Sequence, residues 1–211
     1  MISELLGLFA LAFPAVFLVV DPIGVVPLFV AMTANDPPEK VQQMARRACV
    51  TGCALLVFFA LFGGLVFKLF GVTLGAFRVA GGLLLLVTSL DMVNARPART
   101  RTSPTETREG VEKEDVAIVP LAIPLLSGPG AIATVMVLMS RGKGVLTAIP
   151  VALSVLLTFG VSYLVLRGAP LVQRVLRRTG VAIVERVMGL ILAAIAVQFI
   201  AEGGRALLAS P

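Results

Sequence analysis

The sequence contains no histidine and no tryptophan, and only two of its 211 residues are cysteine. The chain therefore lacks the usual nitrogen and sulfur ligands of transition-metal sites, and it lacks the side chain that most often acts as a general base near neutral pH. No glycine-rich loop with the lysine of nucleotide-binding proteins is present either. We predict no metal site and no cofactor, and we predict that the protein is not an enzyme.

Charged residues are also scarce. They make up 14% of the chain, whereas hydrophobic residues make up 58%. An ordinary soluble domain has about 25% charged and about 45–50% apolar residues. A soluble fold of this size could not bury so much apolar surface, and the same numbers argue against disorder and against nucleic-acid binding. The composition predicts an all-α integral membrane protein whose surroundings are a lipid bilayer.

The apolar residues are grouped into runs. A helix that crosses a bilayer needs about 20 mostly apolar residues. No basic leader precedes the first run, so we expect it to be retained rather than cleaved as a signal peptide. We expect six transmembrane helices at roughly residues 5–33, 48–70, 74–94, 116–139, 145–166 and 184–208.

One long polar connection, residues 95–115, divides the chain into a first three-helix part, 1–94, and a second, 116–211. Of the 18 Lys and Arg residues, 13 lie in or beside the connections that follow the first, third and fifth spans, and five lie elsewhere. The positive-inside rule places these three connections in the cytoplasm. We therefore expect the 95–115 loop to be a cytoplasmic linker and both termini to be periplasmic or extracellular.

The connection between the first two spans carries a helix-start pattern. In Asp36-Pro37-Pro38-Glu39, Asp36 fits the N-cap position and Pro37 the first helical position. The second helix is therefore expected to begin before its apolar run, outside the bilayer.

The two parts of the chain show a weak internal repeat. Asp21-Pro22 aligns with Gly128-Pro129 at an offset of 107 residues, and Arg78-Val79-x-Gly81 aligns with Arg186-Val187-x-Gly189 at 108. Each part holds three spans, and an odd number reverses the side of entry. The second repeat is thus expected to be inverted relative to the first, an architecture found in secondary transporters.

Both repeats contain an interruption in their first span. Asp21-Pro22-Ile23-Gly24 combines an N-cap residue with a proline at the first helical position, which predicts that the helix stops and restarts there. Ser127-Gly128-Pro129-Gly130 predicts the same in the fourth span. We expect both breaks to lie near the midplane, where an ionisable side chain such as Asp21 is costly and normally faces a partner or a cavity. Proline kinks and close glycine packing are the alternative interpretation of such residues.

The two breaks differ in charge. The N-terminus of a half-helix offers free N–H groups and a partial positive charge, which favour anions. The second break carries no acid, whereas Asp21 places a negative charge at the first. A small zwitterion fits both, with its carboxylate at the second break and its ammonium group near Asp21. Gln198 in the last span is either part of this site or a contact between helices. The predicted substrate-binding residues are Asp21, Pro22, Ile23, Gly24, Ser127, Gly128, Pro129, Gly130 and Gln198.

These two interrupted stretches, DPIGVVPLF at 21–29 and IPLLSGPGAI at 123–132, resemble the two signature stretches of the MarC/SnatA family of bacterial and archaeal inner-membrane proteins. The resemblance covers essentially the whole chain. It implies a secondary transporter of small neutral amino acids such as glycine and alanine, built from inverted three-helix repeats. The signature positions are Asp21, Pro22, Gly24 and Pro27 in the first stretch, and Pro124, Gly128, Pro129 and Gly130 in the second.

Residues and resemblance together predict a secondary active transporter that works by alternating access. Asp21 is the expected coupling residue, because burial would let its carboxyl group take up and release a proton. A sodium site built from Asp21 and unwound carbonyls fits the sequence equally well. The alternatives are a channel and a membrane scaffold protein that transports nothing. The expected partners are the amino-acid substrate and the bilayer, without nucleic acid, and a homo-oligomer is compatible with the sequence.

Overall fold

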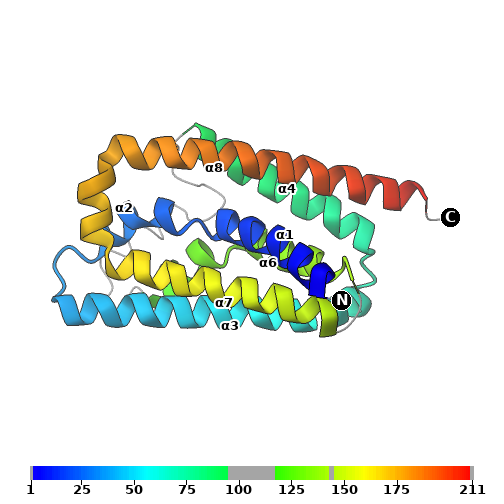
Figure 1. Ribbon diagram of the computed structural model, residues 1–211, viewed down its shortest axis with the longest axis horizontal. Helices are drawn as coiled ribbons and strands as arrows, with labels where there is room; N and C mark the ends of the chain where they lie inside the picture. Colours follow the sequence, from blue (N-terminus) through cyan, green and yellow to red (C-terminus); the bar gives the residue numbers. More distant parts are fainter. Residues whose placement is uncertain (1, 95–116, 143–144, 210–211) are drawn as a thin grey trace.

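The computed structural model describes residues 2–94, 117–142 and 145–209, and all regular structure in these residues is helical (Figure 1). The predicted linker at 95–115 lies outside the described residues. The elements are α1 (Ile2–Val20), α2 (Pro22–Met32), α3 (Pro38–Phe70), α4 (Leu74–Val93), the π-helix η1 (Ala117–Leu126), α6 (Pro129–Met139), α7 (Val145–Arg167) and α8 (Ala169–Leu208).

The first predicted break is present at a single residue. The Asp21 amide still donates to the Phe17 carbonyl at 2.9 Å, as in a continuing helix, but Asp21 itself has φ 50° and ψ 61°. This left-handed conformation redirects the chain, and aspartate tolerates it better than most residues because its short side chain bonds locally. Helix α2 then restarts at Pro22, as the sequence predicts.

The second predicted break is also present, and it separates two different kinds of helix. Residues 117–126 form a π-helix, and the Ser127 amide closes it by donating to the Ala122 carbonyl at 3.0 Å. Pro120 and Pro124 lack amide hydrogens, so a regular ladder of i to i−4 bonds cannot form here. Gly128 has an extended backbone, and α6 begins at Pro129.

Two helix starts differ from the sequence-based expectation. Helix α3 begins at Pro38, and its first carbonyl acceptor is Pro37, which bonds the Val41 amide. The prediction of Asp36 as N-cap is therefore wrong by one residue, because Asp36 instead pairs with Lys40 at 2.7 Å. Helix α8 begins well before residue 184, and it bends at Arg177, where φ is 52° (Figure 1).

The helices form three layers in the view of Figure 1. Helices α4 and α8 pack together on one side, α3 and α7 pack together on the other, and the broken helices lie between these pairs. The broken helices also contact each other through α1 and α6. The two breaks are thus held in the interior of the bundle.

Helices α4 and α8 are antiparallel and approach very closely. Small residues recur every seven positions on both, so the same face meets the partner over several turns. A Cβ atom added to Gly82 would lie 2.8 Å from the Ala196 carbonyl oxygen, and one added to Gly203 would lie 2.7 Å from that of Gly75. Small residues permit such close packing of membrane helices. The contacting pairs are Gly75 with Gly203, Gly82 with Ala196, and Ser89 with Gly189.

Five helical segments of the described residues are long and apolar enough to cross a bilayer: Ser3–Met32, Pro38–Leu65, Leu74–Val93, Leu146–Arg167 and Thr179–Leu208. Helix α6 is apolar but shorter. Large apolar side chains are exposed along α3, α4, α7 and α8, among them Phe58, Leu83, Leu156 and Leu190. Outward-facing leucine and phenylalanine are stable in lipid, so the surface agrees with the membrane class that the composition indicates.

Candidate functional site

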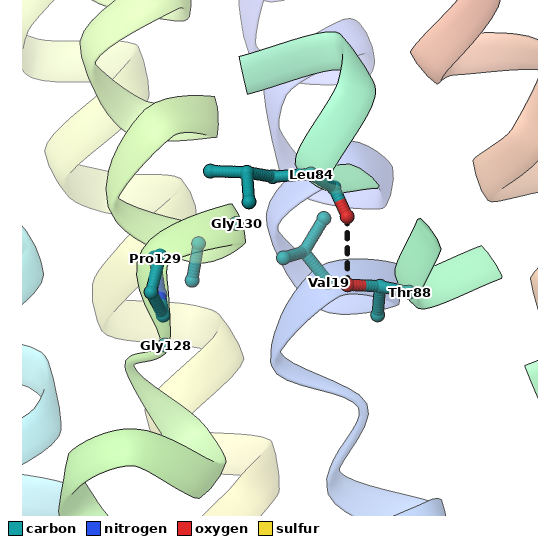
Figure 2. Close-up of a pocket in the computed structure, with 7 residues that line it drawn as sticks. Val19, Leu84, Thr88, Gly128, Pro129 and Gly130 are labelled. Atoms are coloured by element: carbon teal, nitrogen blue, oxygen red, sulfur yellow. Dashed lines mark hydrogen bonds between the residues drawn. The ribbon is translucent and has the colours of Figure 1, made fainter. Parts of the chain in front are cut away.

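A small cavity lies between the second break and the end of α1, just before the first break (Figure 2). The cavity has a volume of about 30 Å³ and is lined by Gly128–Ala131 at the start of α6, by Val19 at the end of α1, and by Leu84 and Thr88 of α4. Val19 precedes the first break by two residues. The N-terminal end of α6 and the C-terminal end of α1 therefore lie beside the same part of α4.

Glycine at position 130 keeps the cavity open. A Cβ atom added to Gly130 would lie 3.3 Å from Leu85 Cδ2, 3.7 Å from Val19 Cγ1 and 3.9 Å from Thr88 Oγ1. Thr88 Oγ1 donates to the Leu84 carbonyl one turn earlier at 2.9 Å (Figure 2). A volume of this size holds a water molecule or two. The described conformation is consequently too tight for an amino acid.

The start of α6 is the more electropositive of the two breaks. The first amides of a helix have no acceptor within it, and Gly128 at the N-cap provides no side chain to cap them. Ser127 contributes less than the sequence suggests. Its hydroxyl donates to the Gly52 carbonyl of α3 at 3.0 Å, and its amide is used within η1. The donors left for a ligand are backbone amides at Gly130 and Ala131.

The first break carries an acidic side chain. Asp21 is only 3% exposed, and its Oδ1 accepts the Gly24 amide at 3.1 Å, which caps α2. Pro22 is buried beside it, whereas Ile23 and Gly24 are half-buried. The sequence therefore identified both the cap and the burial of Asp21. Asp21 itself lies just beyond the lining of the cavity.

A second carboxylate, that of Glu185, lies at the first break and was missed by the sequence analysis. A Cβ atom on Gly24 would collide with Asp21 Oδ2 and would lie 2.8 Å from Glu185 Oε1. Both carboxylates therefore lie against the same glycine. Glu185 lies next to Arg186 at the start of the predicted sixth span, where a charged pair is expected at the membrane surface and not against another helix. Only the packing of α2 on α8 reveals it.

Gln198 does not line the cavity and lies far along α8 from the first break. Its side chain is exposed and donates to Glu202 Oε1 at 3.0 Å, one turn further along α8. Thirteen residues of helix separate Gln198 from Glu185, a rise of about 20 Å. The hydrogen bond of Gln198 is therefore within α8, which is neither of the two interpretations that the sequence left open, a site residue or a contact between helices. Among the described residues no group of three or more His, Cys, Asp or Glu side chains is placed to hold a metal ion.

The bundle of apolar helices with an exposed apolar surface defines a multi-pass helical integral membrane protein. A family model described as "MarC family integral membrane protein" matches residues 6–208. The chain belongs to the MarC family, as its two signature stretches predict.

Relatives of the chain cover nearly its full length. A UPF0056 membrane protein of Methanocaldococcus jannaschii is 41% identical over 197 residues, which is 93% of this chain and 96% of the relative. The UPF0056 membrane protein YvbG of Bacillus subtilis is 33% identical, covering 90% of this chain and 91% of the relative. The protein YhcE of Escherichia coli is 32% identical, covering 90% and 89%. No solved structure matches the chain.

Proposed function

We propose that this protein is a secondary active transporter of small neutral amino acids such as glycine and alanine. The observation that carries the proposal is the meeting of two broken helices at one internal cavity. Backbone amides free of intrahelical partners and an acidic group are brought within one region of the bundle interior. Discontinuous helices of this kind form the substrate and ion sites of several transporter folds.

The charges at the two breaks support a zwitterionic substrate. The start of α6 favours a carboxylate, because its amides and the helix dipole both attract negative charge. The Asp21 and Glu185 carboxylates at the first break favour an ammonium group. A small substrate suits a narrow cavity whose lining is glycine, alanine, valine, threonine, proline and leucine. Asp21 would also carry the coupling ion, either a proton or sodium.

The helix contacts support an inverted repeat of six spans. Exchanging the first span with the fourth, the second with the fifth and the third with the sixth maps most of the larger helix contacts onto one another. The α1–α7 contact maps onto α3–η1, the α2–α7 contact onto α3–α6, and the α2–α8 contact onto α4–α6. The contacts α4–α8 and α3–α7 map onto themselves, and the α1–α6 contact maps onto α2–η1. A pseudo-two-fold axis between the halves would produce this pattern.

The small volume of the cavity supports an alternating-access cycle. A cavity of about 30 Å³ cannot hold an amino acid, so a substrate needs the lining elements to separate. Helices α4 and α6 are the natural moving parts, because each contributes one wall. In this proposal the described conformation is an occluded one.

Uptake by purified protein in liposomes tests the proposal. Radiolabelled glycine and L-alanine should accumulate with saturation, and excess unlabelled L-alanine should compete better than D-alanine. Imposed proton and sodium gradients, applied separately, identify the coupling ion. A channel would give flux without saturation in the same concentration range, and a scaffold protein would give none. Either result would refute the transporter.

The remaining features of the proposal follow from the sequence. The transporter would lie in the inner membrane with both termini outside, because the basic connections favour the cytoplasm. It would need no cofactor and would catalyse no covalent reaction. Its partners would be the amino acid and the bilayer, without nucleic acid, and its oligomeric state is open.

A further inference from the structure

Side-chain contacts fix the C-terminal end of α6 to two other helices. Ser140 caps α6, and Arg78 Nη2 of α4 donates to its hydroxyl oxygen at 3.1 Å. Arg141, the next residue, donates through Nη2 to both carboxylate oxygens of Glu202 on α8, at 2.9 and 3.0 Å. We call these four residues, Arg78, Ser140, Arg141 and Glu202, the α6 latch.

The ion pair of the latch has further support on α8. Glu202 Oε1 also accepts from Gln198 Nε2 at 3.0 Å, and the Arg141 guanidinium carbon lies 5.9 Å from the centre of the Phe199 ring. The Arg141 and Glu202 side chains are 22% and 30% exposed. The pair is thus shielded from solvent more than an ordinary surface pair, so its loss has a larger effect.

The latch lies beside a large cavity at one end of the molecule. This cavity has a volume of about 390 Å³ and is lined by residues of α1, including Glu4 and Leu8, and by Arg141, Gly142 and Thr147. Both chain ends lie at the same end of the bundle (Figure 1). The start of α6 at the small cavity is one helix of 11 residues away, a rise of about 16 Å. Arg141 therefore lines an outer space large enough for an amino acid and lies at the opposite end of α6 from the interior site.

Two hydrogen-bond donors of the latch have no partner in its closed form. Within the described residues, Arg78 Nε and Arg141 Nε are buried and have no hydrogen-bond partner. A buried donor without a partner costs free energy that an open arrangement, wetted by solvent, would recover. The closed latch is consequently balanced between an ion pair that holds it and two unpaired donors that oppose it.

The other end of the bundle is arranged differently. There Thr33 Oγ1 donates to the Phe29 carbonyl of its own helix, and Lys40 pairs with Asp36 four residues away. These contacts are local in sequence and join no half-helix to a distant element. At the C-terminal end of α6, by contrast, the contacts of the latch join α6 to α4 and α8.

We propose that the α6 latch is the gate that closes the path to the interior site from the end of the protein that carries both termini. Breaking the Arg141–Glu202 pair frees α6 from α8 and opens that path. The inference rests on the proposed alternating-access function, since a gate at one end has a purpose only in such a cycle.

Charge reversal combined with accessibility labelling tests the gate. Thr88→Cys on the wall of the small cavity serves as reporter in a Cys49→Ala, Cys53→Ala background. A membrane-impermeant thiol reagent is added from the side that carries the termini. Arg141→Glu and Glu202→Arg should each speed labelling by about tenfold or more, because either change replaces attraction with repulsion. The double exchange should restore slow labelling.

Two control variants make the result decisive. Glu202→Gln keeps the side-chain shape and should accelerate labelling less, and it replaces any reversal variant that is not monodisperse on gel filtration. The exchange of Asp36 and Lys40 at the other end should leave the rate unchanged. Unchanged labelling in the single variants, or fast labelling in the double exchange, would overturn the gate. Because labelling needs no substrate, the two proposals can fail separately. The gate can be supported when amino-acid uptake is absent, and uptake can be observed when the gate is refuted.

Discussion

At the scale of single residues, the first break depends on Asp21. Its backbone turns the chain, one carboxylate oxygen caps α2, and the other lies beside Gly24 together with the Glu185 carboxylate. One buried side chain therefore combines a structural and a chemical role. Substitutions that separate the two roles are the most informative.

Asp21→Asn removes the charge and retains the structure. Asparagine caps helices and tolerates the left-handed conformation about as well as aspartate. We expect folding to persist while uptake of glycine or alanine falls by at least about tenfold, because the charge expected to bind the ammonium group or the coupling ion is gone. Liposome uptake measures the loss, and gel filtration checks the fold. Asp36→Asn, at the connection before α3, is the matched control, and normal uptake by Asp21→Asn would remove Asp21 from the site.

Gly24→Ala tests the close approach of the two carboxylates. The added methyl group would collide with Asp21 and Glu185, so we expect a loss of stability of about 1–3 kcal/mol, as in overpacked interiors. Thermal unfolding in detergent measures it. Gly64→Ala is the control within a helix, because a Cβ there meets nothing within 4 Å and alanine favours helix by up to about 1 kcal/mol. Equal unfolding temperatures for Gly24→Ala and the unmodified protein would contradict the described geometry.

At the scale of elements, the two interrupted helices were predictable and their surroundings were not. Pro22 and Pro129 lack the amide that a continuous helix needs, so each break follows from the local sequence. The hydroxyl of Ser127 was expected to face a ligand, but it bonds the Gly52 carbonyl of α3. Which acceptor a serine finds depends on the neighbouring helix, which the local sequence does not specify.

The α4–α8 pair gives a test at this scale. Gly82→Ala would place a methyl group 2.8 Å from the Ala196 carbonyl oxygen, which belongs to the backbone and cannot rotate away. The two helices must separate, and we expect unfolding to become easier by about 1–3 kcal/mol. Gly204→Ala on α8 meets nothing within 4 Å and should be neutral or stabilising. The unfolding temperatures of the two variants in detergent test this expectation. An unchanged temperature for Gly82→Ala would show that α4 and α8 are less closely packed than described here.

At the scale of the whole molecule, the distribution of basic residues predicts the orientation. Helix α3 separates Glu39 from Val72, both of which are exposed. Single cysteines at these positions, in a chain without Cys49 and Cys53, report the two sides. We expect an impermeant thiol reagent to label intact cells at residue 72 and not at 39, because the basic connection lies inside. The opposite labelling pattern would show that the protein has the inverse orientation in the membrane. Labelling at both positions would show that α3 does not cross the membrane.

The sequence by itself determined the membrane class, the apolar runs and the position of both breaks. Composition, proline chemistry and the cap at Asp21 do not depend on contacts between distant residues, so they lead to the same prediction in any fold. Only the tertiary structure placed Glu185 beside Asp21, joined Arg141 to Glu202 and showed how little room the breaks enclose. These facts depend on contacts between residues far apart in the chain, where packing of whole helices decides which side chains meet.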